Sequence, residues 1–288
     1  MAEPTPDLKT YYGNCHCGAF KFSVKLPELK SVMTCNCSIC LKKGTWWVFP
    51  GAGCLTVEQG EDHLKSYEYG PCKLEHKKFC PTCGTGVHGK RKGAPEGMDI
   101  GLNARTLRDV DLWSLEITKY DGHALEPQYT PHPYDGPEPT AQYDNAKVYT
   151  GTCHCGAVGM AMKTPGPLAT SGQHIEECEC SICAREGVIL TYPSPPQIHI
   201  TNASFLTSYS YGRKFRSWEF CPVCGVCVWA RKFDLTAEEY ASYGDADEDQ
   251  AVWKARMNVN LRVLDGVEWD DIKIARGGNE SEPKYVVQ

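Results

Sequence analysis

Cysteine is the residue type on which the chemistry of this chain depends. The sequence holds 17 cysteines in 288 residues, and most of them stand in short, closely spaced groups. An odd number of clustered cysteines does not suit a disulfide framework and is more typical of metal ligation in a reducing compartment. The pattern therefore predicts metal sites, and zinc is the metal that such thiolate sets most often hold.

Two cysteine pairs recur in each half of the chain. The first half has Cys15 and Cys17 as C-x-C, and Cys80 and Cys83 as C-x-x-C in a CPxCG turn. Two pairs give the four thiolates of a closed structural zinc site, with an iron–sulfur cluster as the alternative occupant. The corresponding set in the second half is Cys153, Cys155, Cys221 and Cys224.

A third group lies between the pairs and has the spacing C-x-C-x-x-C. It consists of Cys35, Cys37 and Cys40 in the first half and of Cys178, Cys180 and Cys183 in the second. Three protein ligands leave one tetrahedral position of zinc open for water or substrate, as in catalytic sites. We predict such open sites here. The alternative is a site closed by a fourth side chain, for which the candidates are Cys54, Cys72, His63 and His88 in the first half and Cys227 and His174 in the second.

These seven cysteines belong to an internal repeat. The segments GNCHCGA, CNCSIC, SYEYG and FCPTCG return in the same order as GTCHCGA, CECSIC, SYSYG and FCPVCG, at an offset of roughly 140 residues. Four elements in one order indicate a duplicated domain. We expect a first domain over residues 1–125, a Pro-rich linker over 126–144 and a second domain over 145–288, because clustered prolines favour extended backbone.

The elements that must position the cysteines are mostly strands. Residues 20–26 alternate strictly between apolar and polar types, as a half-buried strand does. Residues 44–50, 187–193 and 198–201 are β-branched and aromatic between glycine and proline breaks. Residues 112–120 and 269–275 resemble each other as late strands of the two copies. The sequence therefore predicts a mainly β fold of two tandem, small, irregular domains, each stabilised by zinc. We expect the acidic insertion at 233–250 to be a surface loop with a short helix, or a lid over a site.

The composition limits which binding partners and which cellular compartment we expect. The net charge of -6 gives no electrostatic case for nucleic acid, and we interpret Lys42, Lys43 and the basic run at 90–92 as solvated surface. No apolar run approaches the roughly 18 residues of a membrane span, and the first residues lack the features of a signal peptide. We expect a cytoplasmic protein, with the nucleus as the alternative. The two copies could pack as a pseudo-dimer within one chain.

The order G-x-C-x-C-G, C-x-C-S-x-C, F-C-x-x-C-G resembles the glutathione-dependent formaldehyde-activating enzyme (GFA) family, which also contains centromere-protein-V-like proteins. The resemblance covers most of both halves. It implies a β-tent fold related to zinc ribbons, with a structural zinc on the four paired cysteines of each copy. It also implies a second zinc on each three-cysteine group, near which a glutathione adduct forms. Up to four zinc ions per chain, with glutathione as co-substrate, would follow.

The two copies depart from that family's pattern in different ways. Where members often carry His between the first two loop cysteines, this chain has Asn36 and Glu179. Where a basic residue often precedes the FCxxCG turn, the first copy has Lys77 and Lys78 and the second has Trp218 and Glu219. The acidic residues Glu176, Glu177 and Glu179 make the second site more negative, which disfavours an anionic thiol. We therefore expect chemically unequal sites.

The resulting functional prediction is a zinc-dependent carbon–sulfur lyase or adduct-forming enzyme that acts on a glutathione- or thiol-linked small molecule. Glu179 is the candidate proton carrier in the second copy, beside the catalytic three-cysteine groups. We interpret His16 and His154 as hydrogen-bonding near the metal or exposed, and a set of aromatic residues as core or cleft lining: Trp46, Trp47, Tyr67 and Tyr69. The alternative function is a non-catalytic, zinc-stabilised module that binds a protein or chromatin.

Overall fold

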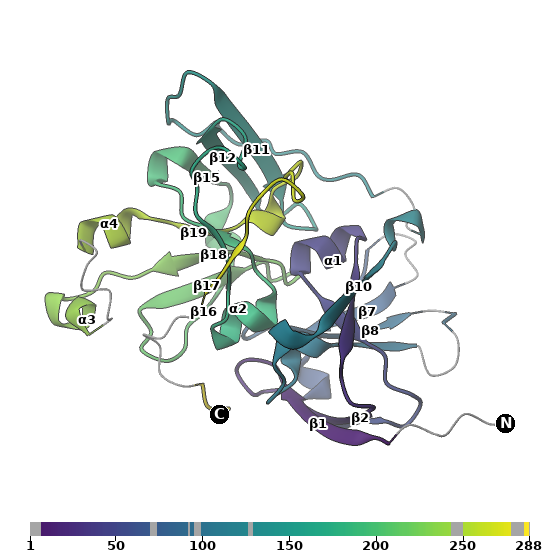
Figure 1. Cartoon of the computed structure of the whole chain (residues 1–288). Coiled ribbons are helices and arrows are strands. Elements are labelled where there is room, and N and C mark those ends of the chain that lie inside the picture. The colour runs from purple at the N-terminus through teal and green to yellow at the C-terminus, as the bar shows by residue number, and fades with distance from the viewer. Residues whose placement is uncertain are drawn as a thin grey trace. The chain divides into compact units, whose positions relative to one another are not determined.

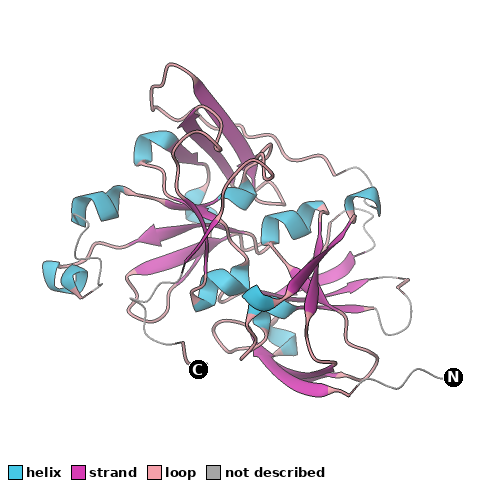
Figure 2. Ribbon diagram, viewed as in Figure 1, coloured by secondary structure: helices cyan, strands magenta, loops and turns pink. Residues whose placement is uncertain are grey.

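The computed structural model describes residues 7–69, 74–91, 93–94, 99–125, 129–242, 250–277 and 285–287. The chain divides into two compact units: the residues up to Tyr129 together with Val287 belong to the first, and Thr130–Val286 form the second. We call them unit one and unit two. Strands are the main regular secondary structure of each unit, and the helices are short (Figures 1 and 2). The predicted mainly β fold with two sheet-rich domains is confirmed.

Each unit contains an antiparallel three-stranded sheet. In unit one its order is β1 (Lys9–Asn14), β2 (Lys21–Leu26), β5 (Leu55–Gln59). In unit two it is β11 (Ala146–Thr152), β12 (Gly159–Pro165), β15 (Ile198–Ile200). In β2, Phe22, Val24 and Leu26 are buried while the residues between them are more exposed. Successive side chains of a strand point to opposite faces, so the apolar alternation at 20–26 defines the buried face.

A seven-stranded sheet completes each unit. In unit one the order is β10-β3-β4-β9-β8-β7-β6. The strands are β3 (Ser31–Cys35), β4 (Trp46–Val48), β6 (Lys65–Tyr67), β7 (Leu74–Phe79), β8 (Gly86–Arg91), β9 (Ile100–Asn103) and β10 (Glu116–Tyr120). The unit-two order is β16-β17-β18-β19-β14-β13-β20. Its strands are β13 (Ile175–Cys178), β14 (Leu190–Thr191), β16 (Thr207–Tyr209), β17 (Arg216–Phe220), β18 (Cys227–Lys232), β19 (Asn258–Asn260) and β20 (Ala275–Gly277).

Read from its other end, the unit-two order matches the unit-one order strand for strand, so the sequence repeat extends to the topology. In both sheets the last strand joins parallel to the strand that carries the first cysteine of the C-x-C-x-x-C group, β10 to β3 and β20 to β13. The late strand of unit two lies further along the chain than predicted. It begins at Ala275, where the expected segment 269–275 ends.

A short helix follows each C-x-C pair: α1 (Ser38–Lys43) and α2 (Ser181–Glu186). Each ends at a glycine in the left-handed conformation, Gly44 with φ 57° and Gly187 with φ 64°. The third cysteine of each group therefore lies on a helix. Other helical turns are Glu61–His63, Ala104–Thr106, Leu112–Ser114, His123–Leu125, Pro195–Gln197, Ala203–Phe205, Leu261–Val263, α3 (Ala237–Ala241) and α4 (Gln250–Ala255).

The interpretation of Lys42 and Lys43 as solvated surface is wrong. Their exposed fractions are only 5% and 9%. The Lys43 ammonium donates to the Gly84 carbonyl at 3.3 Å and lies 5.4 Å from the centre of the Phe79 ring. A lysine can bury its apolar stem while its charged end reaches a polar group, and here α1 directs the stem inward.

The acidic insertion contains α3, which begins with a capping box between Thr236 and Glu239. Trp253 of α4 is buried and packs with Phe215, Leu235 and Tyr240. The insertion is thus anchored to the unit by an apolar cluster. Residues 243–249, which include part of the acidic run, lie outside the described residues.

Residues 130–144, expected as linker, lie against the three-stranded sheet of unit two. The Tyr134 hydroxyl is 2.9 Å from His199 Nδ1, and the Ala141 amide donates to the Pro196 carbonyl at 2.8 Å. Glu138 pairs with Lys163 at 2.6 Å. The second compact unit, Thr130–Val286, therefore includes these residues.

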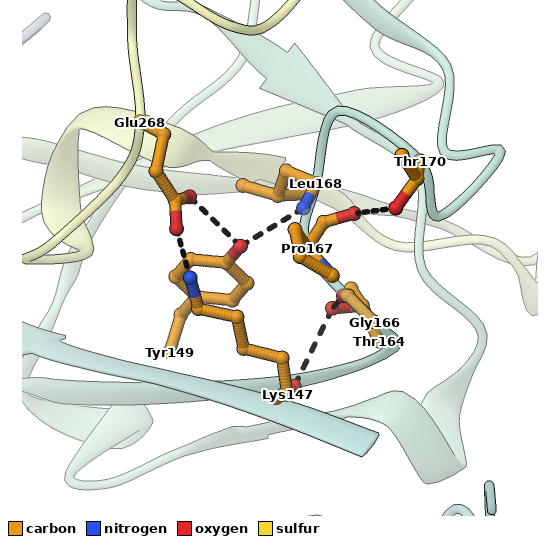
Figure 3. A network of polar contacts seen from close by, with 8 residues as sticks. All are labelled: Lys147, Tyr149, Thr164, Gly166, Pro167, Leu168, Thr170 and Glu268. Atoms are coloured by element: carbon orange, nitrogen blue, oxygen red, sulfur yellow. Dashed lines mark hydrogen bonds and ion pairs between the residues drawn. The ribbon is translucent and has the colours of Figure 1, made fainter. Parts of the chain in front are cut away.

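A polar network ties the same sheet to the C-terminal segment (Figure 3). The Tyr149 hydroxyl accepts from the Leu168 amide and donates to Glu268, both at 2.9 Å, and Lys147 pairs with the same carboxylate. In unit one the corresponding Tyr11 hydroxyl accepts from the Leu29 amide at 2.9 Å. None of the described helices is long and apolar enough to cross a membrane.

Candidate metal centres

The four paired cysteines of unit one lie together in what we call a four-cysteine centre. Their sulfurs, from Cys15, Cys17, Cys80 and Cys83, all lie within 4.8 Å of one another. Cys17 Sγ is 3.6 Å from the sulfurs of Cys15 and Cys80. Four sulfurs about 2.3 Å from a tetrahedral zinc stand about 3.8 Å apart, whereas a disulfide brings two to about 2.05 Å. The separations therefore fit zinc.

Unit two has the same arrangement, formed by Cys153, Cys155, Cys221 and Cys224. Cys155 Sγ is 3.6 Å from Cys153 Sγ and 3.5 Å from Cys221 Sγ. In unit one the turns that bring the pairs together use Gly18 and Gly84, whose φ values of 78° and 81° are left-handed and favour glycine.

His16 and His154 stand between the paired cysteines, and both are buried. Their exposed fractions are 2% and 1%, so of the two interpretations given for these histidines exposure is excluded. The His16 backbone amide donates to the Thr85 hydroxyl at 3.2 Å, which helps to join the two turns of the four-cysteine centre.

The second kind of centre, which we call a three-cysteine centre, forms where β3 or β13 meets the following helix. Cys35, Cys37 and Cys40 have their sulfurs within 4.8 Å of one another, and so do Cys178, Cys180 and Cys183. Within the described parts of the chain, no fourth cysteine, histidine or carboxylate joins either set. Three clustered thiols fit a zinc ion with one ligand position left for another molecule.

The side chains suggested as fourth ligands make other contacts. His63 lies 3.0 Å from the Thr82 hydroxyl, His88 lies 3.2 Å from Glu61, and His174 lies 3.1 Å from Glu176. Cys54 and Cys227 join neither three-cysteine set, and Cys72 lies outside the described residues.

In unit one the Cys40 sulfur accepts two further hydrogen bonds. The Lys77 ammonium donates at 3.1 Å and the Trp47 indole N–H at 3.3 Å. Lys77 is 7% exposed, and its ammonium lies 4.9 Å from the centre of the Trp47 ring. Burial alone would lower the pKa of Lys77, but the charges of Cys40 and Cys37 outweigh it and raise that pKa. Hydrogen bonds from Cys35 and Cys37, together with the Lys77 charge, hold the pKa of Cys40 well below its usual range.

The sequence pointed to Lys77 and Lys78 only as basic residues before the FCxxCG turn. The structure separates them, because neighbouring residues of a strand face opposite sides. Lys77 reaches Cys40, whereas Lys78 pairs with Glu61 on the other face of β7. Trp47, one of the four aromatic residues interpreted as core or cleft lining, is buried like Trp46 and Tyr67, and Tyr69 is half-buried.

Unit two surrounds its three-cysteine centre with different residues. In the strand register of unit two, Trp218 lies opposite Tyr209, which is the position that Lys77 holds opposite Tyr67 in unit one. Likewise, Leu190 lies opposite Asn260, which is the position that Trp47 holds opposite Asn103. Trp218 and Leu190 thus replace the two residues that donate to Cys40.

Other groups set the charge around the unit-two centre. Hydrogen bonds from Cys178 and Cys183, with a smaller effect of the Arg216 charge, lower the pKa of Cys180. The hydroxyl of the half-buried Tyr192 donates to Glu176, and desolvation followed by this bond raises the pKa of Tyr192.

A turn after β10 lies against the unit-one centre. Asn36 Nδ2 donates to Asp121 at 2.8 Å, and the His123 amide donates to Asn36 Oδ1 at 2.9 Å. Gly122, between them, is buried, and a Cβ atom built on it would lie 2.3 Å from Cys35 Sγ. Asn36 therefore holds the turn by hydrogen bonds, and the position against the sulfur has room only for glycine.

Glu179 occupies the position of Asn36 in unit two. Its side chain is exposed, and its backbone amide donates to the Gly277 carbonyl at 2.7 Å. The structure thus places this carboxylate at the surface, in the sequence position between the first two cysteines of the centre.

Comparison with known proteins agrees with this arrangement. The sequence model of one family, described as glutathione-dependent formaldehyde-activating enzyme, matches residues 10–115 and 148–262. Each match contains all seven recurring cysteines of its unit. A crystal structure of a Rhodobacter sphaeroides protein is similar at 24% sequence identity and a TM-score of 0.32, over 44% of this chain and 98% of that chain.

Proposed function

The chain belongs to the glutathione-dependent formaldehyde-activating enzyme family, and we propose that it forms or breaks a carbon–sulfur bond in a glutathione- or other thiol-linked small molecule. One observation carries this proposal. Each C-x-C-x-x-C group gathers three thiols within 4.8 Å, and no fourth ligand side chain joins them in the described parts of the chain. A ligand set of this size suits a centre that takes up a substrate atom, whereas the four-cysteine sets suit structural sites.

In this proposal, Cys35, Cys37 and Cys40 hold one zinc, and Cys178, Cys180 and Cys183 hold another. A bound zinc would supply a Lewis acid that favours the deprotonated form of a substrate thiol. The four-cysteine centres, one per unit, would tie the early C-x-C turn to the late CPxCG turn and so contribute folding free energy.

The reaction we propose is the addition of a thiol to an aldehyde, or its reverse. In the forward direction the sulfur forms a bond to the carbonyl carbon, and the carbonyl π pair moves to oxygen. That oxygen takes a proton equivalent to the one the thiol has lost. In the reverse direction the carbon–sulfur bond breaks, and thiol and aldehyde are released. Electrons and protons balance without an oxidant or reductant.

The protein must also move that proton. In unit two we propose Glu179 as the carrier, because its exposed carboxylate can exchange protons with water. In unit one the same position is Asn36, which has no ionisable group and holds the turn at Gly122. Proton transfer in unit one would therefore depend on water or on the substrate itself.

The test combines metal analysis with turnover. Wild type, Cys37→Ser and Cys180→Ser would be measured for zinc content, and then for exchange of glutathione with formaldehyde and a panel of aldehydes by NMR. We expect wild type to exceed the uncatalysed rate and at least one variant to lose this gain together with one zinc. Fully loaded wild type with no rate above background would overturn the proposal and favour a zinc-stabilised binding module.

A further inference from the structure

The two three-cysteine centres share their ligand spacing and differ in the charged and hydrogen-bonding groups around them. We infer that Lys77 makes the unit-one centre the one that accepts an anionic thiol, and that the unit-two centre lacks this capacity. This inference rests on the proposed function, because it concerns the thiol that the proposed reaction would use. It names a positioning residue and assigns the binding of an anionic thiol to unit one, which leaves the unit-two centre, with Glu179, to substrates other than an anionic thiol.

The first argument is that Lys77 belongs electrostatically to the centre. A buried ammonium is costly unless a negative group compensates it. Lys77 is buried, and its ammonium lies 3.1 Å from Cys40 Sγ. Cys40 belongs to one set with Cys35 and Cys37, whose sulfurs all lie within 4.8 Å of one another. Its compensating charge is therefore the three-cysteine centre itself.

The second argument is the charge balance. Three thiolates and one divalent zinc sum to a charge of about -1, and a fourth thiolate would bring the sum to about -2. Lys77 changes these sums to about zero and about -1. Since charge is expensive away from water, the centre with the lysine takes a fourth thiolate more easily. The Trp47 N–H, also donating to Cys40, acts in the same direction because it stabilises charge on sulfur.

The third argument is the contrast with unit two. Trp218 stands at the Lys77 position, and its indole N–H finds no hydrogen-bond partner among the described residues. Cations are present in unit two as well, because Arg216 acts on Cys180 and Arg276 lies opposite Glu177 in the β13–β20 pair. However, Glu176 and Glu177 directly precede Cys178, where unit one has the uncharged Met33 and Thr34. The described part of unit two thus lacks an ammonium–sulfur hydrogen bond at its third cysteine like the one from Lys77 to Cys40.

Binding, rather than turnover, tests this inference. The full chain would be loaded with Co²⁺, whose visible absorption reports a thiolate entering a sulfur-ligated centre, and titrated with glutathione. Imidazole serves as the uncharged probe of the same ligand position. The variants are Lys77→Met, Lys77→Arg and the matched unit-two control Trp218→Phe, with Cys37→Ser and Cys180→Ser to identify the centre that responds.

We expect Lys77→Met to weaken glutathione binding about tenfold or more and to change imidazole binding less than about twofold, because only glutathione adds charge. Lys77→Arg should restore most of the glutathione affinity, and Trp218→Phe and Cys180→Ser should leave it unchanged. Cys37→Ser should abolish it. If Lys77→Met does not retain the metal, Lys77→Gln provides the same comparison, since its amide keeps an N–H donor without the charge.

Four results would overturn the inference: equal losses of glutathione and imidazole binding in Lys77→Met, unchanged glutathione affinity in that variant, loss of glutathione binding in Cys180→Ser, or no glutathione binding by wild type. Glutathione binding without turnover would instead remove the proposed function and leave the role of Lys77 intact.

Discussion

Replacing Gly122 by alanine tests the unit-one three-cysteine centre with a single methyl group. The new Cβ would lie 2.3 Å from Cys35 Sγ and 3.2 Å from the Cys37 Cβ, whereas ordinary contacts begin at 3.4 Å. The sulfur or the turn must therefore move by about 1.1 Å. The turn resists such a movement because Asn36 is bonded to both Asp121 and His123.

A zinc site tolerates ligand displacements of only about 0.2 Å, so a shift of this size is incompatible with three thiolates on one metal. We expect Gly122→Ala to reduce the zinc content by one ion per chain. Overpacking should also cost unit one about 1–3 kcal/mol of stability.

The assay is the zinc content of the purified full-length chain, together with the number of thiols that react rapidly with a disulfide reagent. Gly122→Ala should expose the three unit-one thiols. The control is Gly51→Ala, where the added Cβ meets only Cys54 Sγ, at an ordinary 3.7 Å. If Gly122→Ala keeps its zinc and its thiols stay protected, the Gly122 backbone does not lie against Cys35, and the description of this turn is refuted.

Three further predictions concern the four-cysteine centres and the stability of each unit. Cys83→Ser and Cys224→Ser should each remove one zinc and lower the unfolding temperature of their own unit, and a chelator added to wild type should destabilise both units. Calorimetry with metal analysis measures these changes. An unchanged unfolding transition would contradict a structural role. Tyr149→Phe should lower the free energy of unfolding of unit two by about 1–3 kcal/mol, because the Tyr149 hydroxyl bonds to both Leu168 and Glu268. Tyr11→Phe removes the bond from Leu29 and should lower the free energy of unfolding of unit one by less. Urea unfolding of the two variants measures both changes. Burial lowers the pKa of His88, so the folded state binds its proton less readily than the unfolded state and loses stability as the pH falls below about 6.5. Relative to wild type, His88→Gln should lose less stability between pH 7.5 and pH 5.5, and identical pH profiles would disprove the assignment.

The sequence could predict what depends on local patterns and on the repeat. The alternating segment at 20–26 forms β2 in the structure, and the two copies of the repeat form seven-stranded sheets with the same strand order. The sulfurs also gather in the sets that their spacing indicated. The short helices α1 and α2 left no readable signal, because six residues are too few for a helical period to show.

Contacts between distant segments could not be predicted in this way. The Lys77–Cys40 hydrogen bond joins residues 37 apart, and the Asn36–Asp121 bond joins residues 85 apart. Both depend on which strands become neighbours in the seven-stranded sheet. The burial of Lys42 and Lys43 was missed for a related reason, since composition alone does not tell on which side of α1 the protein interior lies.

The parallel pairing of β10 with β3 has a consequence for biosynthesis. The strand that carries Cys35 gains its outer neighbour only when residues 116–120 have left the ribosome, and β13 likewise waits for residues 275–277. Pairings between such distant segments form slowly, because a long loop must close first. The C-x-C-x-x-C thiols of each unit therefore lie in an incomplete sheet for most of the time in which that unit is translated. During this time oxidants and competing metals can reach them.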